Sequence, residues 1–139
     1  MSERNGKENG KPRLDERVRV ALVEDNDVFR ETLELLLGLR GDIVVVASVA
    51  TGQEAVEVCA ELEPDVVLVD YRMPGLNGAQ TTTEVLRASP TSRVVCLTAS
   101  ISRDEMSSLI EAGAVACLTK DEDLEQIVAS IHSAAAAAA

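Results

Sequence analysis

The chain has 139 residues, which is enough for one domain with a buried core but leaves no room for a second folded domain. Its formal net charge of -11 argues against binding of nucleic acid or of an anionic membrane by this domain, because like charges repel each other. The sequence has neither the apolar core of a signal peptide nor an apolar run of bilayer length, and we expect a cytoplasmic protein.

The three cysteines, Cys59, Cys96 and Cys117, form no CxxC pair, and each lies among apolar residues. An odd number of cysteines in such surroundings is typical of free thiols in a reducing compartment. We therefore favour three buried thiols over a redox or metal-binding role.

Residues 1–16 are polar, carry charges of both signs and have almost no apolar side chain to bury, so we expect a disordered leader. The expected folded domain is residues 17–132. Residues 133–139 are rich in alanine, which has a high helix propensity. This tail either extends the last helix, leads into a linker or is an artificial addition.

Five runs of apolar or β-branched residues predict strands. The expected strands are residues 17–23, 43–49, 66–69, 93–97 and 114–119. The third run is apolar at every position, which is typical of a strand buried on both faces. It is followed directly by the carboxylate of Asp70 and then by a loop rich in Pro and Gly.

Five amphipathic stretches between the strands predict helices. The expected helices are residues 27–39, 51–63, 77–88, 102–112 and 121–132. Thr51 and Ser102 each stand three residues before a glutamate, the spacing of a capping box at a helix start. Gly113 stands where a left-handed cap is needed at a helix end. The residues whose helical spacing assigns them to the core include Val28, Leu33, Leu36, Leu37, Met106, Leu109, Ile110, Leu124, Ile127, Val128 and Ile131.

Strict alternation with short loops implies an α/β fold, with a doubly wound five-stranded parallel sheet and five helices. The carboxyl ends of parallel strands share one edge of the sheet, where ligands of such folds bind. The polar residues that follow four of the strands are Glu24, Asp25, Asp70, Thr98 and Lys120. Each alone has an ordinary structural explanation, but together they form a candidate site.

Three carboxylates in one crevice repel each other unless a cation compensates their charge. We expect Mg²⁺, because it is held by few carboxylates, keeps several waters and leaves room for phosphate oxygens. Zinc is disfavoured, since His132 is the only histidine. We expect Asp70 to act as a nucleophile towards a phosphoryl group, with a hydrogen bond from Thr98 and a positive charge from Lys120.

These residues, with the stretches Glu-Asp-Asn-Asp-Val-Phe-Arg-Glu and Met-Pro-Gly-Leu-Asn-Gly, closely resemble the receiver domains of two-component response regulators, especially NarL/LuxR-type transcriptional regulators. The resemblance covers residues 17–132 and implies a flavodoxin-like receiver fold with strand order 2-1-3-4-5. It also implies that Asp70 takes a phosphoryl group from a histidine kinase. Asp25 would bind Mg²⁺ directly, Glu24 directly or through water, and the backbone carbonyl of Arg72 would add a ligand.

The same resemblance implies a signalling switch that catalyses only its own phosphoryl transfer and autodephosphorylation. Thr98 would move towards the phosphoryl group and remodel the surface formed by the fourth helix, the fifth strand and the fifth helix. That surface is also the candidate homodimer interface. A DNA-binding domain in a longer parent protein would provide the output.

Two positions depart from the family pattern. Cys117 stands where the family usually has an aromatic residue whose ring turns inward on activation. Either the loop around Thr98 and Ser100 alone carries the signal, or the coupling is weak. Asp121 follows Lys120 where many relatives have proline, and a trans bond is expected there because a cis bond without proline costs about 2.5–4 kcal/mol.

Two other functions stay open on the sequence. A pseudo-receiver, which is never phosphorylated and acts only as a protein-interaction module, would suit Cys117 but not the complete set of polar strand ends. A phosphatase of the haloacid dehalogenase type would also use an aspartate after a strand, but it typically needs a second acid where this chain has Arg72. The side chain of Arg72 either screens the phosphoryl group or is a solvated loop arginine.

Overall fold

Five strands alternate with five helices in the structure, a computed structural model that describes residues 16–137. The strands are β1 (Val18–Val23), β2 (Ile43–Val49), β3 (Val66–Val69), β4 (Arg93–Thr98) and β5 (Ala116–Thr119). The helices are α1 (Asp27–Gly38), α2 (Gly52–Leu62), α3 (Gly78–Ala88), α4 (Arg103–Ala112) and α5 (Leu124–Ala137). The expected disordered leader lies outside the described residues, apart from residue 16. None of the described helices is long and apolar enough to cross a membrane.

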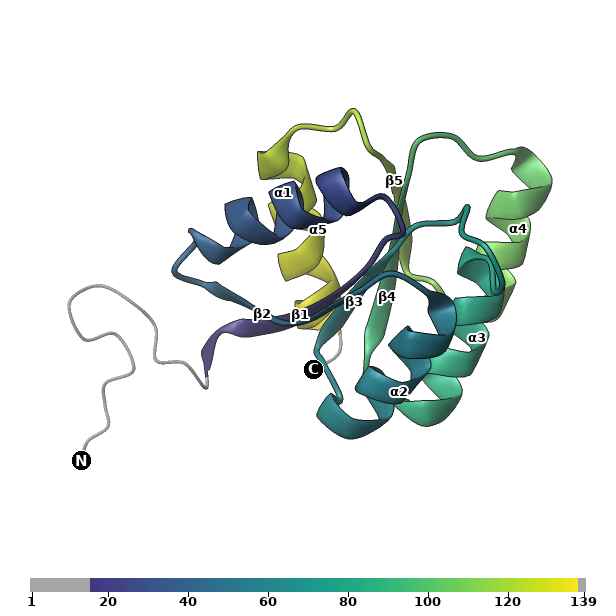
Figure 1. Cartoon of the computed structure of the whole chain (residues 1–139), viewed down its shortest axis with the longest axis horizontal. Coiled ribbons are helices and arrows are strands. Elements are labelled where there is room, and N and C mark those ends of the chain that lie inside the picture. Colours follow the sequence, from purple (N-terminus) through teal and green to yellow (C-terminus); the bar gives the residue numbers. More distant parts are fainter. Residues whose placement is uncertain (1–15, 138–139) are drawn as a thin grey trace.

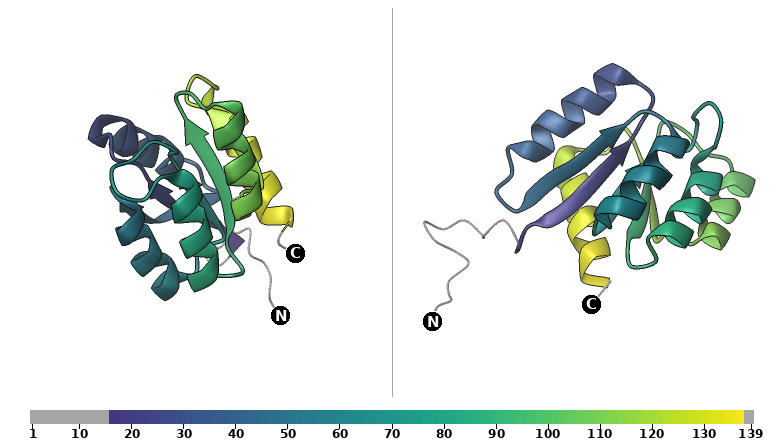
Figure 2. Two further views of the ribbon diagram at one scale, coloured as in Figure 1. Left: turned by 90° about the vertical axis from the view of Figure 1, so that its right-hand side faces the viewer. Right: turned by 60° about the horizontal axis from the view of Figure 1, so that its bottom comes forward.

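The strands form one parallel sheet in the order β2-β1-β3-β4-β5, which confirms the doubly wound fold and the strand order implied by the receiver resemblance. Helices α1 and α5 cover one face of the sheet, and α2, α3 and α4 cover the other (Figure 1, Figure 2). Because all five strands run in the same direction, the segments that follow them leave the sheet at one edge.

Helix caps form where the sequence places them, with one difference. Ser102 and Glu105 form the complete capping box at the start of α4. Thr51 accepts a hydrogen bond of 3.1 Å from the amide of Glu54 at the start of α2. The Glu54 carboxylate reaches one residue further back than in a capping box and accepts from the amide of Ala50 at 3.1 Å.

The last strand starts two residues later than the sequence predicts, and the hydrogen bonds that close α4 include the first of these residues, Ala114. Gly113 has a left-handed conformation with φ 111°, as predicted. The amide of Ala114 donates to the carbonyl of Leu109 at 3.0 Å and so closes the helix. The strand therefore begins at Ala116 instead of Ala114.

The last helix also begins and ends later than predicted. The side chain of Asp123 accepts a hydrogen bond of 2.9 Å from the amide of Gln126, which caps the helix there and leaves residues 121–123 in the preceding loop. The helix continues to Ala137, so the alanine-rich tail extends it through the described residues. The described residues contain no cis peptide bond, in agreement with the trans bond expected before Asp121.

The core lies on both faces of the sheet around β3, whose four residues are all buried, as predicted. Leu37 of α1 and Ile131 of α5 are fully buried on one face. Cys59 of α2 and Val85 of α3 are fully buried on the other. A central strand covered on both sides supports its carboxyl end rigidly.

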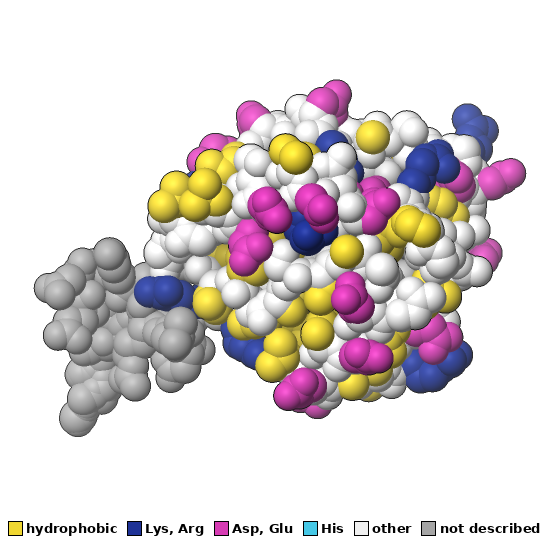
Figure 3. Space-filling view, in the orientation of Figure 1, with side chains coloured by type: hydrophobic (Ala, Val, Ile, Leu, Met, Phe, Trp, Pro, Cys, Tyr) yellow, Lys and Arg dark blue, Asp and Glu magenta, His cyan; other side chains and the backbone are white. Residues whose placement is uncertain are grey.

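Three residues assigned to the core by helical spacing are exposed instead: Val28 by 75%, Leu36 by 37% and Ile110 by 64%. Their helices, α1 and α4, lie towards the two ends of the sheet and cover it with a narrow stripe. Helix α1 buries only Leu33 and Leu37. Hydrophobic side chains therefore gather on the surface over the C-terminal part of α1, at the left of Figure 3.

The cysteines are all free thiols, as predicted. Cys59 and Cys96 are fully buried, but Cys117 is only half-buried, because β5 is the edge strand of the sheet. The prediction of three buried thiols is therefore wrong for Cys117.

Replacing the fully buried Ile131 by alanine should lower the free energy of unfolding by about 2–5 kcal/mol, because it removes buried methylene groups and leaves a cavity under α5. Urea denaturation followed by circular dichroism measures the change. Ile110→Ala is the matched control, since that side chain is 64% exposed, and it should change the free energy little. Equal losses in the two variants would contradict this account of the core.

Candidate functional site

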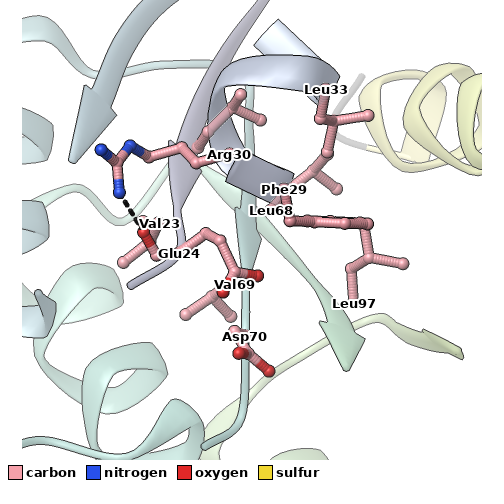
Figure 4. Close-up of a pocket in the computed structure, with 10 residues that line it drawn as sticks. Val23, Glu24, Phe29, Arg30, Leu33, Leu68, Val69, Asp70 and Leu97 are labelled. Atoms are coloured by element: carbon pink, nitrogen blue, oxygen red, sulfur yellow. Dashed lines mark hydrogen bonds between the residues drawn. The ribbon is translucent and has the colours of Figure 1, made fainter. Parts of the chain in front are cut away.

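The carboxylates of Asp70 and Glu24 are positioned by neighbouring strands of the sheet. The amide of Asp70 donates to the carbonyl of Val23 at 3.0 Å, and the amide of Glu24 donates to the carbonyl of Val49 at 3.0 Å. Both residues are only 6% exposed. Figure 4 shows Glu24 and Asp70 near each other beyond the ends of β1 and β3, and their carboxylates offer oxygens within 4.8 Å of each other.

Lys120 joins these two carboxylates from the end of β5. Its amide donates to the carbonyl of Thr98 at 2.9 Å, which holds the ends of β4 and β5 together. Its Nζ lies 2.6 Å from Oε1 of Glu24 and 3.3 Å from Oδ2 of Asp70. The same Nζ lies 4.5 Å from the centre of the Phe29 ring. One ammonium group thus bridges carboxylates from two different strands.

The electrostatics of the cluster follow from burial and from this pairing. Burial raises the pKa of Glu24, while hydrogen bonds from Lys120 and from the Asn26 amide act in the opposite direction, and the charge of Asp70 raises it further. Burial lowers the pKa of Lys120, but the hydrogen bond to Glu24 and the two carboxylate charges outweigh burial, so its pKa is raised overall. Lys120 is therefore charged at neutral pH.

The acidic residues of the cluster fit a magnesium ion. Glu24, Asp25 and Asp70 each offer one oxygen, and these oxygens all lie within 4.8 Å of one another. Asp25 is exposed and the other two are buried, so the cluster opens to solvent on one side. Oxygen ligands suit Mg²⁺. The histidine that zinc would favour is engaged differently, since His132 Nε2 lies 2.6 Å from a carboxylate oxygen of Asp42.

Thr98 is fully buried at the end of β4. Its hydroxyl donates to the carbonyl of Ser100 at 3.4 Å. This hydrogen bond is long compared with the usual O–H···O distance of about 2.7–2.8 Å, and it is correspondingly weak. A stronger acceptor at the site would therefore replace it readily.

The loop after Asp70 returns closely to the strand before it enters α3. The amide of Gly78 donates to the carbonyl of Tyr71 at 2.7 Å. A Cβ at Gly78 would lie 2.6 Å from the Cα of Tyr71, so only glycine permits this approach. Gly75 has a positive φ of 79°, which also favours glycine. These two glycines set the path of the loop.

The side chain of Arg72 is bound to the start of α4. Its guanidinium donates two hydrogen bonds, of 2.9 and 2.7 Å, to the carboxylate of Glu105. This carboxylate also accepts from the amide of Ser102 at 2.8 Å within the capping box. The hydrogen bond from Arg72 lowers the pKa of Glu105. Arg72 is therefore no simple solvated arginine, although its side chain is 51% exposed.

Sequence reasoning missed three residues of the site: Phe29, Arg30 and Glu105. Arg30 donates from its guanidinium to the carbonyl of Glu24 at 2.6 Å, as Figure 4 shows. The sequence feature that could have identified Phe29 and Arg30 is their position in the helix that begins directly after Glu24 and Asp25. Glu105 was identified as a capping residue, but no sequence pattern links it to Arg72.

Comparisons with known proteins identify the family. The model of the response regulator receiver domain matches residues 20–132, so the chain belongs to this family. This match excludes the alternative function, a phosphatase of the haloacid dehalogenase type. The chain resembles the signal receiver domain of the putative response regulator NarL from Mycobacterium tuberculosis, with 34% identity and a TM-score of 0.81 over 87% of this chain and 98% of that one.

Its relatives place it among receivers of the NarL/LuxR type. The transcriptional regulatory protein LnrK of Bacillus subtilis (strain 168) is 37% identical over 82% of this chain and 52% of the relative. The nitrate/nitrite response regulator protein NarL of Escherichia coli (strain K12) is 30% identical over 84% of this chain and 54% of the relative. The chain therefore spans about half the length of the curated relatives that it matches.

Glu105→Gln should loosen the loop after Asp70, because glutamine can still cap α4 but cannot form the charged pair with Arg72. We expect faster amide hydrogen exchange in residues 71–78, with the exchange of β3 unchanged. Glu111→Gln removes the same charge near the other end of the same helix and serves as the control. If both variants leave the exchange of the loop unchanged, the pair does not restrain it.

Proposed function

We propose that Asp70 is the phosphoacceptor of this receiver and takes a phosphoryl group from a histidine kinase in a Mg²⁺-dependent reaction. The observation that carries this proposal is the bridge from Lys120 to Glu24 and Asp70, with Asp25 beside them. It combines a nucleophile on a rigid strand, an acidic cation site and a positive charge for the phosphoryl oxygens. Phosphoryl transfer depends mainly on such positioning and charge compensation.

Each residue has a defined part in the proposed reaction. A carboxylate oxygen of Asp70 attacks phosphorus while the bond from phosphorus to the kinase histidine breaks, and that histidine nitrogen keeps the electron pair and takes up a proton. Glu24, Asp25, Asp70 and the backbone carbonyl of Arg72 would hold Mg²⁺, which would neutralise charge on the phosphoryl oxygens. Lys120 supplies a second positive charge, and the Thr98 hydroxyl donates to a phosphoryl oxygen.

The charge change at Asp70 then acts on the surface of α4, β5 and α5. When Thr98 turns towards the phosphoryl group, it gives up its weak bond to Ser100, and the loop into α4 is free to rearrange. This surface carries the exposed side chains of Ile110 and Val115 and is the proposed homodimer face. The output is transcriptional control in a longer parent protein, and the chain itself is a switch that catalyses only its own phosphoryl transfer and autodephosphorylation.

Incubation with Mg²⁺ and acetyl phosphate should add one phosphoryl group, measured by intact mass, and Asp70→Asn should abolish the adduct. Asp65→Asn is the matched control, because Asp65 lies at the opposite end of β3, where its carboxylate accepts from the amide of Arg19 at 2.8 Å. The control should be phosphorylated like the parent chain. An adduct that persists in Asp70→Asn would refute the assignment of the phosphoacceptor.

Titration with Mg²⁺ should give a saturable rise in the thermal unfolding midpoint, because the ion binds the folded state. Asp25→Asn should weaken binding at least tenfold, which is about 1.4 kcal/mol. Asp27→Asn, which changes an acidic side chain that is 73% exposed and two residues away, should leave binding unchanged. A parent chain without a saturable response would instead be a pseudo-receiver that acts as a protein-interaction module.

A further inference from the structure

Cys96 and Cys117 lie side by side on neighbouring strands. They are register partners in the parallel pairing of β4 with β5, so their side chains project from the same face of the sheet. Neighbouring strands are about 4.7–4.9 Å apart. A disulfide needs a Cα separation of about 4.4–6.8 Å, so this pairing lies within its range.

The two cysteines belong to one small apolar cluster. Cys96 is one of its buried members, and the side chain of Cys117 packs against the cluster. The side chains of Tyr71 and Leu109 pack around the pair. Cys96 is fully buried, whereas Cys117 is half-buried. The pair therefore consists of one inner and one outer thiol.

The outer thiol is reached through a groove between α4 and β5. The groove has a volume of about 110 Å³, and it is lined by Met106, Leu109, Ile110, Ala114, Val115, Ala116 and Cys117. A hydrogen peroxide molecule is close to a water molecule in size, and one water occupies about 30 Å³ in the liquid. The groove is therefore large enough to admit a peroxide to the sulfur of Cys117.

We propose that Cys96 and Cys117 form a redox-active dithiol, which peroxide entering through the groove between α4 and β5 oxidises to a disulfide across the two strands. This site is separate from the phosphoacceptor and does not depend on the proposed phosphorylation. In a reducing compartment such disulfides are transient and sense oxidants, unlike the structural disulfides of secreted proteins.

The reaction takes two steps. The Cys117 thiolate attacks one peroxide oxygen, so an S–O bond forms, the O–O bond breaks and the second oxygen leaves as water after gaining a proton. The Cys96 sulfur then attacks the sulfur of Cys117, so the S–S bond forms, the S–O bond breaks and a second water leaves. The two thiols lose two electrons, and peroxide is reduced to two waters.

The surroundings determine how fast the pair reacts. Burial raises the pKa of both Cys96 and Cys117, so the thiolate is scarce at neutral pH and the oxidation should accelerate as the pH rises. Cys59 lies on α2 in a different part of the core, fully buried, and burial raises its pKa to about 11. Since the cluster around Cys59 contains no second cysteine with which it could form a disulfide, Cys59 should stay reduced.

The disulfide would join two strands that end in site residues. Cys96 is two residues before Thr98, and Cys117 is three residues before Lys120. A covalent link at this point would fix β4 against β5 just before both side chains enter the site. The oxidised form would thus restrain the strand end from which Thr98 has to move.

The test is peptide mapping of the full chain after treatment with hydrogen peroxide at pH 8. Intact mass should fall by two hydrogen atoms, and a tryptic digest without reductant should contain residues 94–103 joined to residues 104–120. Dithiothreitol should restore both peptides and both thiols. Cys59→Ser should give the same product, while Cys96→Ser and Cys117→Ser should each abolish it.

Three results would overturn the proposal: a Cys117 sulfinic acid without the joined peptides, an intermolecular disulfide through Cys117, or three thiols that stay reduced. The decisive product forms in the unmodified chain, so the test does not depend on whether either serine variant folds. Repetition with Asp70→Asn should give the same joined peptides, which separates this outcome from that of the phosphorylation experiments.

Discussion

The bridge from Lys120 to Glu24 and Asp70 is the interaction on which the arrangement of the site depends. Two nearly buried carboxylates within reach of each other would be costly without a compensating charge. The ammonium supplies this charge, and it comes from a strand at the far edge of the sheet. The bridge therefore connects the ends of β1, β3 and β5 in one cluster. A bound cation and a phosphoryl group would change the charge balance at the same atoms.

The surroundings of this cluster differ in rigidity. Asp70 stands on a strand that is buried on both faces, so its position is fixed by packing and by the ladder bond to β1. The hydroxyl of Thr98 makes only a long hydrogen bond, and the Arg72 pair with Glu105 lies at the protein surface. A change of charge at the rigid residue is therefore expected to move its more weakly held neighbours, which lead to α4.

The region of α4 and β5 combines several properties of this chain. Cys117 stands where the receiver resemblance implies an aromatic residue, and it lines the groove between α4 and β5. It also pairs with Cys96 in the register of β4 and β5. The residue at position 117 thus belongs both to the surface of the proposed switch and to the proposed dithiol. Oxidation and phosphorylation would act on neighbouring ends of β4 and β5.

The sequence by itself determined the element order, the buried third strand and most helix caps, because these depend on residues that are near each other in the chain. It also predicted that the acidic pair, Asp70, Thr98 and Lys120 lie at one edge of the sheet, since the carboxyl ends of parallel strands lie at the same edge. Only the tertiary structure decided that Arg72 pairs with Glu105, 33 residues away, and that Cys96 meets Cys117. It also decided that Val28, Leu36 and Ile110 are exposed. These features depend on the path of a loop, on the register of two strands and on the location of α1 and α4 towards the two ends of the sheet. Local sequence patterns do not specify any of these.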